Sequence, residues 1–323
     1  MRSPYPDQAR QRDEWILSKR PARLPLDPQK PFAFLAERER SESGEVVSVA
    51  TLFLTNRECP WRCLMCDLWK NTLPDSVPAG AIPDQIDFAL ERLAPARQIK
   101  LYNSGSFFDP RAIPIADHPR IAERLRDFER VIVESHPSLI NKRCLPFRDL
   151  LPGQLEVAMG LETAHPGVLE KLNKRMTLDD FARAARFLKR EGMALRAFVL
   201  VKPPFLNEVE ALHWAKRSID FALDSGAAVV SLIPTRFGNG ALEQLAEQGD
   251  FSPPRLDTVE EAMAYGVGLR RGRVFADLWD LATFSDCSAC FPARRDRLER
   301  MNLEQVTPEP QECPVCENSV QRS

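Results

Sequence analysis

The chain has 323 residues, 44% of them hydrophobic, and 44 basic residues nearly balance 46 acidic ones to give a formal net charge of −2. This length and hydrophobic content exclude a disordered chain, and the balanced charge excludes a global positive field that would attract nucleic acid or an anionic membrane. The first residues lack the apolar core of a signal peptide and no run approaches the roughly 18 apolar residues of a membrane span, so we expect a cytoplasmic protein without a membrane partner.

Residues 1–46 are charged and rich in proline, as in the run 20–28, and predict an N-terminal extension. From Val47 onward, apolar β-rich runs alternate with amphipathic stretches, which is typical of a parallel sheet covered by helices. We assign residues 47–254 to this domain and residues 255–323 to a C-terminal helical segment with a four-cysteine metal site. The six predicted strands are 49–54, 98–102, 131–134, 155–161, 195–201 and 228–233.

The helical patterns lie between these strands. The clearest is 178–191, where Thr177 is the predicted N-cap with Asp180 three residues later, and Gly192 ends the helix. Six strand-and-helix units favour an α/β fold with a partial parallel (β/α)6 TIM-like barrel, although the pattern alone also fits a two-sided nucleotide-binding sheet. The other predicted helices are 84–93, 120–128, 208–224 and 258–270.

Three of the eight cysteines follow the first predicted strand as Cys59-x-x-x-Cys63-x-x-Cys66. In a reducing compartment such thiols are ligands more often than disulfides. A cubane 4Fe-4S cluster normally takes four cysteines, so three leave one iron open to a substrate or cofactor. The alternative is a three-cysteine zinc site completed by a distant residue, although structural zinc usually shows paired spacing.

This spacing after a strand, with Met65 before the third cysteine, closely resembles the motif of the radical S-adenosylmethionine (SAM) superfamily. The resemblance implies an enzyme with a 4Fe-4S cluster on Cys59, Cys63 and Cys66. It also implies SAM bound at the open iron and cleaved reductively to a 5′-deoxyadenosyl radical, and an electron donor of the flavodoxin or ferredoxin type. Met65 is then a cofactor-binding residue.

Two further segments resemble the cofactor site of the superfamily. Ser104, Gly105 and Ser106 lie in a small-residue loop similar to the one that receives the methionyl amino group, and Glu134 ends the third strand in a segment similar to the family's Glu-Ser/Thr-Arg-Pro. His136 stands where that segment has arginine, which puts the role of the arginine in doubt. Read without the resemblance, Gly105 and its serines are an ordinary turn after a strand.

Glu162 and Lys202 are the catalytic candidates. Residues 160–163 and 168–174 are similar to the Elongator catalytic subunit, and residues 199–205 to the archaeosine-biosynthesis radical enzymes. Parallel barrels assemble their sites at the carboxyl ends of strands, where both candidates are expected. Otherwise Glu162 is a solvated carboxylate, and Lys202 pairs with a substrate carboxylate or phosphate or faces water.

Two Cys-x-x-Cys pairs near the C-terminus consist of Cys287 with Cys290 and Cys313 with Cys316. Paired spacing predicts a closed zinc site, and an auxiliary Fe-S cluster is the alternative. Arginines make this end locally basic, so it either contacts RNA phosphates or carries ordinary solvated charges. They are Arg270, Arg271, Arg273, Arg294, Arg295, Arg297 and Arg300.

The resemblance to the Elongator and archaeosine enzymes implies a modified nucleoside in tRNA as the substrate. Two alternatives stay open: a radical enzyme acting on a small metabolite, and a non-catalytic metal- or RNA-binding protein that retains the barrel. The intact three-cysteine motif and the intact loop around Gly105 count against the second alternative.

Overall fold

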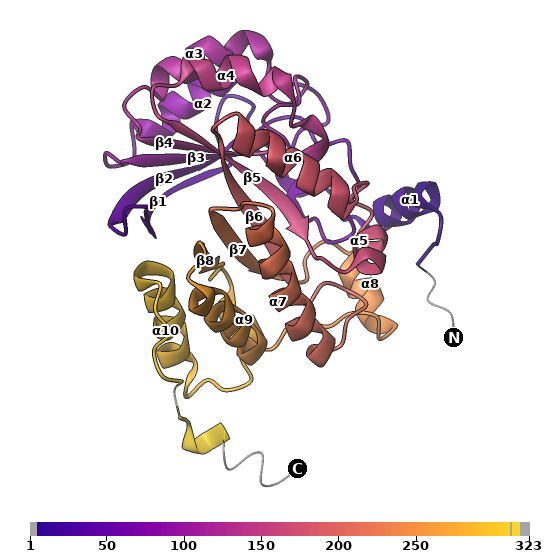
Figure 1. Cartoon of the computed structure of the whole chain (residues 1–323). Coiled ribbons are helices and arrows are strands. Elements are labelled where there is room, and N and C mark those ends of the chain that lie inside the picture. Colours follow the sequence, from indigo (N-terminus) through magenta and orange to yellow (C-terminus); the bar gives the residue numbers. More distant parts are fainter. Residues whose placement is uncertain (1–4, 311, 317–323) are drawn as a thin grey trace.

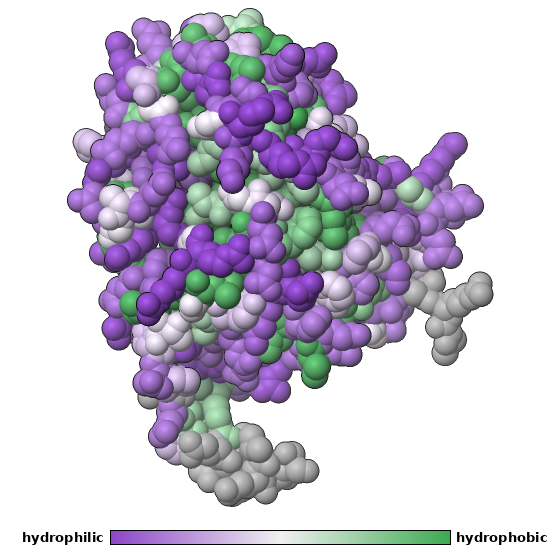
Figure 2. Space-filling view, viewed as in Figure 1, coloured by the Kyte–Doolittle hydropathy of each residue, from purple (hydrophilic) through white to green (hydrophobic). Residues whose placement is uncertain are grey.

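Figure 1 shows a computed structural model of the chain, which describes residues 5–310 and 312–316. One curled sheet runs through the molecule and helices lie along its outer face. Within the described residues, no helix is both long and apolar enough to cross a membrane. The face in Figure 2 is mostly hydrophilic, with hydrophobic side chains in small separate patches.

The sheet has eight strands in the order of the chain, from β1 to β8. The first strand, β1 (Ala33–Arg40), pairs antiparallel with β2, and every later pair is parallel. Parallel strands need crossover connections, and helices supply them. The parallel strands are β2 (Val46–Phe53), β3 (Gln98–Tyr102), β4 (Arg130–Glu134), β5 (Gln154–Glu162), β6 (Ala194–Val201), β7 (Val229–Pro234) and β8 (Arg273–Ala276).

The partial parallel barrel predicted from the sequence is confirmed, and the six predicted strands correspond to β2 through β7. Two strands were missed. The first, β1, lies inside the predicted extension and carries four charged residues among its eight, so it lacks the apolar run of a buried strand. The second, β8, has only four residues. The division of the chain into three domains stays a prediction.

Ten α-helices are described. The main hydrophobic core fills the space between most of them and the outer face of the sheet, while α1 and α8 share a separate cluster. The predicted cap of α6 is confirmed, because the Thr177 hydroxyl accepts from the Asp180 N–H and the Asp180 carboxylate accepts from the Thr177 N–H. The helices are α1 (Ala9–Lys19), α2 (Ala81–Leu90), α3 (His118–Arg124), α4 (Leu145–Leu150), α5 (Pro166–Lys171), α6 (Leu178–Arg190), α7 (Glu208–Asp224), α8 (Ala241–Glu247), α9 (Leu256–Leu269) and α10 (Phe291–Glu304). Short 3-10 helices are Leu68–Asn71, Ile115–Asp117, Pro137–Leu139, Lys142–Cys144 and Leu281–Phe284.

The last helix protects the open edge of the sheet. The Asn302 side chain accepts from the Ala276 N–H at 2.8 Å and donates to the Ala276 carbonyl at 2.9 Å. Gln305 makes the same pair of bonds with Val274, both at 2.8 Å. These side-chain amides hydrogen-bond the backbone N–H and C=O groups at the edge of β8. Left unpaired, those groups could pair with a strand of another chain.

Buried ion pairs fill the inner face of the sheet near the amino ends of its strands. Arg196 bonds to Glu39 at 2.5 Å and to Glu156 at 2.7 Å, while Arg130 bonds to Glu156 at 2.9 Å and Lys100 to Glu39 at 2.7 Å. Burial alone would raise the pKa of Glu39, but Arg196 and Lys100 outweigh it and hold that pKa well below its usual range. This network joins β1, β3, β4, β5 and β6.

Candidate metal centre and cofactor site

The cluster loop, residues 57–67, follows β2 and carries Cys59, Cys63 and Cys66 as free thiols. Burial, together with the charge of another member of the trio, raises the pKa of each thiol to about 12, so the three are electrostatic neighbours. The positive charge of Lys174 acts to lower the pKa of Cys59 and Cys63. The charge of Arg20 acts in the same direction on Cys63 and Cys66. Three half-buried thiols facing cations suit ligands that bind as thiolates.

Two connections on the same side of the sheet fix the backbone of the cluster loop. From the segment after α5, the Leu172 carbonyl accepts from the Leu64 N–H at 2.9 Å and the Asn173 amide donates to the Arg62 carbonyl at 2.8 Å. From the loop after β7, the Asn239 amide donates to the Leu64 carbonyl at 2.7 Å. The loop is therefore held independently of any ligand.

The N-terminal extension also contacts the cluster loop. Glu58, directly before Cys59, pairs with Arg20 at 2.7 Å, with Arg62 at 3.0 Å and with Arg23. The Arg20 guanidinium lies 4.7 Å from the ring centroid of Trp69. The sequence analysis did not predict the contacts of Arg20 and Arg23, because a proline-rich stretch does not indicate which distant residues it will contact.

The glycine-serine loop, residues 103–106, is organised by Glu134. One carboxylate oxygen of Glu134 accepts from the N–H groups of Asn103 at 2.5 Å and Gly105 at 3.3 Å. Burial raises the pKa of Glu134 to about 7, and these backbone bonds oppose the rise. The Ser106 hydroxyl accepts from the His136 N–H at 2.9 Å, so the predicted loop and the end of β4 form one unit.

This loop lies directly against the cluster loop. A Cβ added to Gly105 would lie 3.3 Å from the Cys59 Cβ, so glycine lets the two loops approach closely. Ser104, Glu162 and Lys202 all have positive φ, at 54°, 66° and 55°. Such backbone conformations cost about 1–3 kcal/mol each and concentrate at functional sites. All three are predicted site residues at the carboxyl ends of strands.

His136 stacks on Trp61 of the cluster loop, with ring centroids 3.9 Å apart and planes 9° apart. Its Nδ1 accepts from the Ser138 N–H at 3.2 Å, which leaves Nε2 to donate to the Lys174 carbonyl at 2.9 Å. Burial, followed by the charge of Lys174, lowers the pKa of His136 to about 3. His136 is therefore neutral and connects three segments, whereas the arginine expected there would carry a charge.

Glu162 forms a buried ion pair with Lys174, 2.5 Å between Oε1 and Nζ. Burial lowers the pKa of Lys174, but Glu162 and Cys63 outweigh it and raise that pKa. Lys174 was not among the predicted site residues, although it ends the segment 168–174 that carried the resemblance. The structure brings it between the cluster loop and β5.

Lys202 and Met65, the two remaining predicted site residues, contact parts of the chain outside the glycine-serine loop. Lys202 donates to Glu208, to the Ser252 hydroxyl at 2.9 Å and to the Pro253 carbonyl at 3.2 Å, so its ammonium joins β6 to the start of α7. Met65 packs against a small apolar cluster that includes Leu200. Their catalytic and cofactor-binding roles stay predictions.

Replacing Gly160 by alanine should disrupt the Glu162–Lys174 pair, because the new Cβ would lie 2.0 Å from Glu162 Oε1 and 2.4 Å from Lys174 Nζ. We expect a loss of about 1–3 kcal/mol in unfolding free energy, measured in urea. Gly268→Ala is the matched control, since nothing lies within 4 Å of its added Cβ and alanine favours the helix α9. Equal stability of the two variants would contradict the packing described.

The four C-terminal cysteines converge as predicted, with their sulfur atoms all within 4.8 Å of one another. The Sγ atoms of Cys287 and Cys313 are 4.0 Å apart, and those of Cys290 and Cys316 are 3.8 Å apart. Cys290 is the N-cap residue of α10 and Cys287 lies just before it, so the group lies at the start of this helix. The arrangement could hold a metal ion.

The curled sheet is similar to that of two solved structures. One is Elp3 of Methanocaldococcus infernus, with a TM-score of 0.51, 16% identity, and coverage of 69% of this chain and 59% of that one. The other is methylornithine synthase (PylB), with a TM-score of 0.52, 15% identity, and coverage of 80% of this chain and 72% of that one. The chain thus spans less than two thirds of the solved Elp3 chain.

Three curated proteins are similar to this chain in sequence. Archaeosine synthase subunit beta of Methanosarcina acetivorans is 27% identical over 236 residues, which are 68% of this chain and 67% of that protein. The subunit of the same name from Thermococcus kodakarensis is 28% identical over 218 residues, 63% of this chain and 65% of that protein. An uncharacterized protein of Methanocaldococcus jannaschii is 25% identical over 310 residues, 86% of this chain and 82% of that protein. No family model matches the chain. The predicted resemblance to the superfamily is confirmed.

Proposed function

We propose that the chain is a radical SAM enzyme that binds a 4Fe-4S cluster through Cys59, Cys63 and Cys66 and acts on a nucleoside of tRNA. The observation that carries the proposal is the contact between Gly105 and Cys59, because it joins the three-thiol loop to the loop that Glu134 organises. Three thiols leave room for a non-protein ligand on the cluster. When bound, the cluster supplies the electron that cleaves SAM to a 5′-deoxyadenosyl radical.

The chain's own residues prepare this site. Lys174 and Arg20 provide positive charge beside the three thiols, which favours their thiolate forms when a cluster binds. Glu134 keeps the N–H groups of residues 103–105 aligned, so the loop offers a preformed surface for the methionyl group. His136 and Trp61 hold the cluster loop against β4 without adding charge.

The proposed tRNA substrate is supported by the archaeosine synthase relatives and by a basic groove beside the site. A cavity of about 660 Å³ is lined by five cations and one acid, and its floor includes Met176 and Phe187. Ser138, which bonds to His136, and Arg175, which follows Lys174, also line it. Cations around an apolar floor suit phosphates and a stacked base. The cations are Lys142, Arg175, Arg183, Arg186 and Arg190.

The proposal is tested by loading the full chain with its cluster anaerobically and measuring 5′-deoxyadenosine release from SAM with dithionite, with and without tRNA. Release from the loaded wild-type chain is expected, and tRNA should increase it. Absence of release from a chain that carries its iron would overturn the enzymatic proposal. If tRNA neither binds to the chain nor changes the release of 5′-deoxyadenosine, the substrate is a small metabolite instead.

The RNA contact is tested separately with Lys142→Gln combined with Arg186→Gln, two exposed cations in the groove that make no ion pair within the described residues. Removing two phosphate contacts should weaken tRNA binding roughly tenfold at moderate salt and reduce the salt slope by about 2. Arg126→Gln, an exposed arginine outside the groove, is the matched control. Equal salt slopes in the wild type and both variants would exclude this groove as the RNA contact.

For the C-terminal cysteines we propose zinc. A tetrahedral site with bonds of roughly 2.3 Å has sulfur–sulfur edges of about 3.8 Å, close to the two separations given above. The irons of a cubane occupy separate corners, so its four ligand sulfurs must lie further apart. Burial of Cys290 and the position of the group at the start of α10 indicate a structural role.

We therefore expect one zinc per chain by metal analysis, and loss of that zinc in Cys290→Ser, because a closed site needs all four thiolates. Release of 5′-deoxyadenosine should persist, since the cluster loop lies elsewhere. A second set of about four irons per chain, lost in the same variant, would identify an auxiliary cluster instead.

A further inference from the structure

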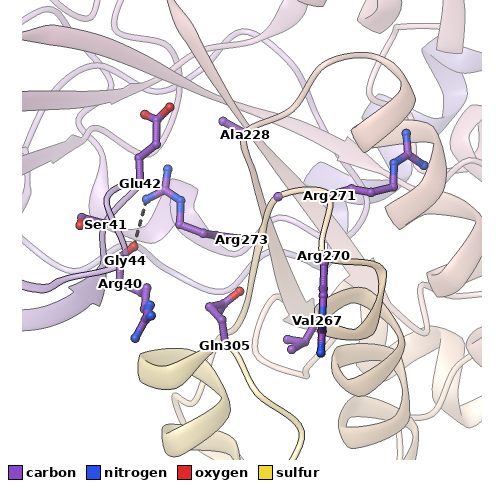
Figure 3. Close-up of a pocket in the computed structure, with 11 residues that line it drawn as sticks. Arg40, Ser41, Glu42, Gly44, Ala228, Val267, Arg270, Arg271, Arg273 and Gln305 are labelled. Atoms are coloured by element: carbon purple, nitrogen blue, oxygen red, sulfur yellow. Dashed lines mark hydrogen bonds between the residues drawn. The ribbon is translucent and has the colours of Figure 1, made fainter.

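A second cavity, of about 430 Å³, opens at the amino ends of the parallel strands, whereas the cluster loop follows the carboxyl end of β2. Figure 3 shows the residues that line this cavity. The turn between β1 and β2 forms one wall, and the connection between α9 and β8 forms another. Ala228, before β7, and Gln305, after α10, complete the lining. Nothing in the proposed radical chemistry uses this end of the sheet.

The lining is strongly basic. Glu42, the one acidic residue in it, is already paired with Arg130 at 2.7 Å. Arg271 is paired with Asp224 at 2.7 Å, and Figure 3 shows it directed away from the others. Within the described residues, the other three arginines have no carboxylate within ion-pair distance. These are Arg40, Arg270 and Arg273.

Arg273 is the most informative of the three. It is 9% exposed, and its Nη1 donates to the Arg40 carbonyl at 3.0 Å while its Nη2 has no hydrogen-bond partner among the described residues. Burial lowers the pKa of Arg273. The charge of Glu156 acts to raise that pKa, but Glu156 already forms ion pairs with Arg196 and Arg130. A buried guanidinium without a counter-ion is destabilising, and an anion in the adjoining cavity would relieve it.

We propose that this cavity is a binding site for a phosphate group, held by Arg40, Arg270 and Arg273. The planar guanidinium donates two parallel hydrogen bonds to an oxyanion, which is why clustered arginines select phosphate. The arginines come from β1, the α9–β8 connection and β8, so the site exists only in the folded sheet. The phosphate belongs either to an RNA backbone or to a free phosphorylated molecule, and the site is independent of the cluster.

The test uses the full cluster-loaded chain and inorganic phosphate as the probe, titrated calorimetrically against chloride at matched ionic strength. Wild type should bind phosphate saturably, and Arg40→Gln combined with Arg270→Gln should weaken binding at least tenfold while retaining the thermal unfolding midpoint. Arg271→Gln is the control, because Arg271 lines the same cavity but is already paired with Asp224. The phosphate affinity of this variant should stay within twofold of wild type. Phosphate binding no tighter than chloride, or equal in wild type and the double variant, would overturn the site.

Measuring tRNA binding in the same variants distinguishes the two sources. Weaker tRNA binding in the double variant, with phosphate competing in the wild type, supports the site and assigns it to the RNA backbone. Unchanged tRNA binding beside lost phosphate binding supports the site and assigns it to a free phosphorylated molecule. The phosphate and tRNA binding measurements do not use SAM cleavage. A chain that fails to cleave SAM would therefore still test the phosphate site.

Discussion

Replacing Cys63 by alanine should reduce bound iron from about four per chain to near zero and abolish 5′-deoxyadenosine release, because two thiolates do not retain a cubane with one open iron. Cys63 lies between the other two cysteines of the loop, and the charge of Lys174 favours its thiolate form. Iron analysis, the visible absorbance of the cluster and the release assay check the result.

Cys144→Ala is the matched control. Cys144 is fully buried, and its thiol lies 3.5 Å from the Leu139 carbonyl, outside the cluster loop. This variant should lose some stability but keep its iron and its activity. Circular dichroism of both variants separates loss of the cluster from loss of the fold. Full iron content in a folded Cys63→Ala chain would show that the cluster is bound elsewhere.

Replacing Arg196 by methionine should lower the unfolding free energy by about 3–5 kcal/mol at pH 7, because it leaves Glu39 and Glu156 buried with fewer partners. Urea unfolding followed by circular dichroism measures the loss. Arg97→Met is the contrast: Arg97 bonds to Glu129 on the surface with a half-exposed side chain, so its loss should change stability far less.

The same network predicts a pH dependence. The pKa values of Glu39 and Glu156 lie below their unfolded values, so their contribution is complete above about pH 4.3 and is lost as the pH falls through their folded values. In Arg196→Met these pKa values rise. The gap between wild type and variant should therefore be widest near neutral pH and narrow as the pH falls toward about 4. A gap that widens on acidification would contradict this assignment.

The sequence by itself determined the elements whose signals are local. Apolar runs located β2 to β7, and the Thr177–Asp180 box located the start of α6 to the residue, because strand burial and helix capping depend on neighbours within a few positions. The spacing of Cys59, Cys63 and Cys66, and of the two C-terminal pairs, likewise predicted two candidate metal sites, since cysteines a few positions apart can ligate one metal centre.

Only the tertiary structure decided the partners that come from distant segments. Lys174 reaches Glu162 through a turn of the chain, Arg20 reaches Glu58 from the extension, and Glu134 reaches the loop around Gly105 from the next strand. Arg40 and Arg273 meet across the gap between the two edges of the sheet. Charged residues give the same local pattern whether they face water or a buried partner, so their roles depend on which strands the curled sheet brings together.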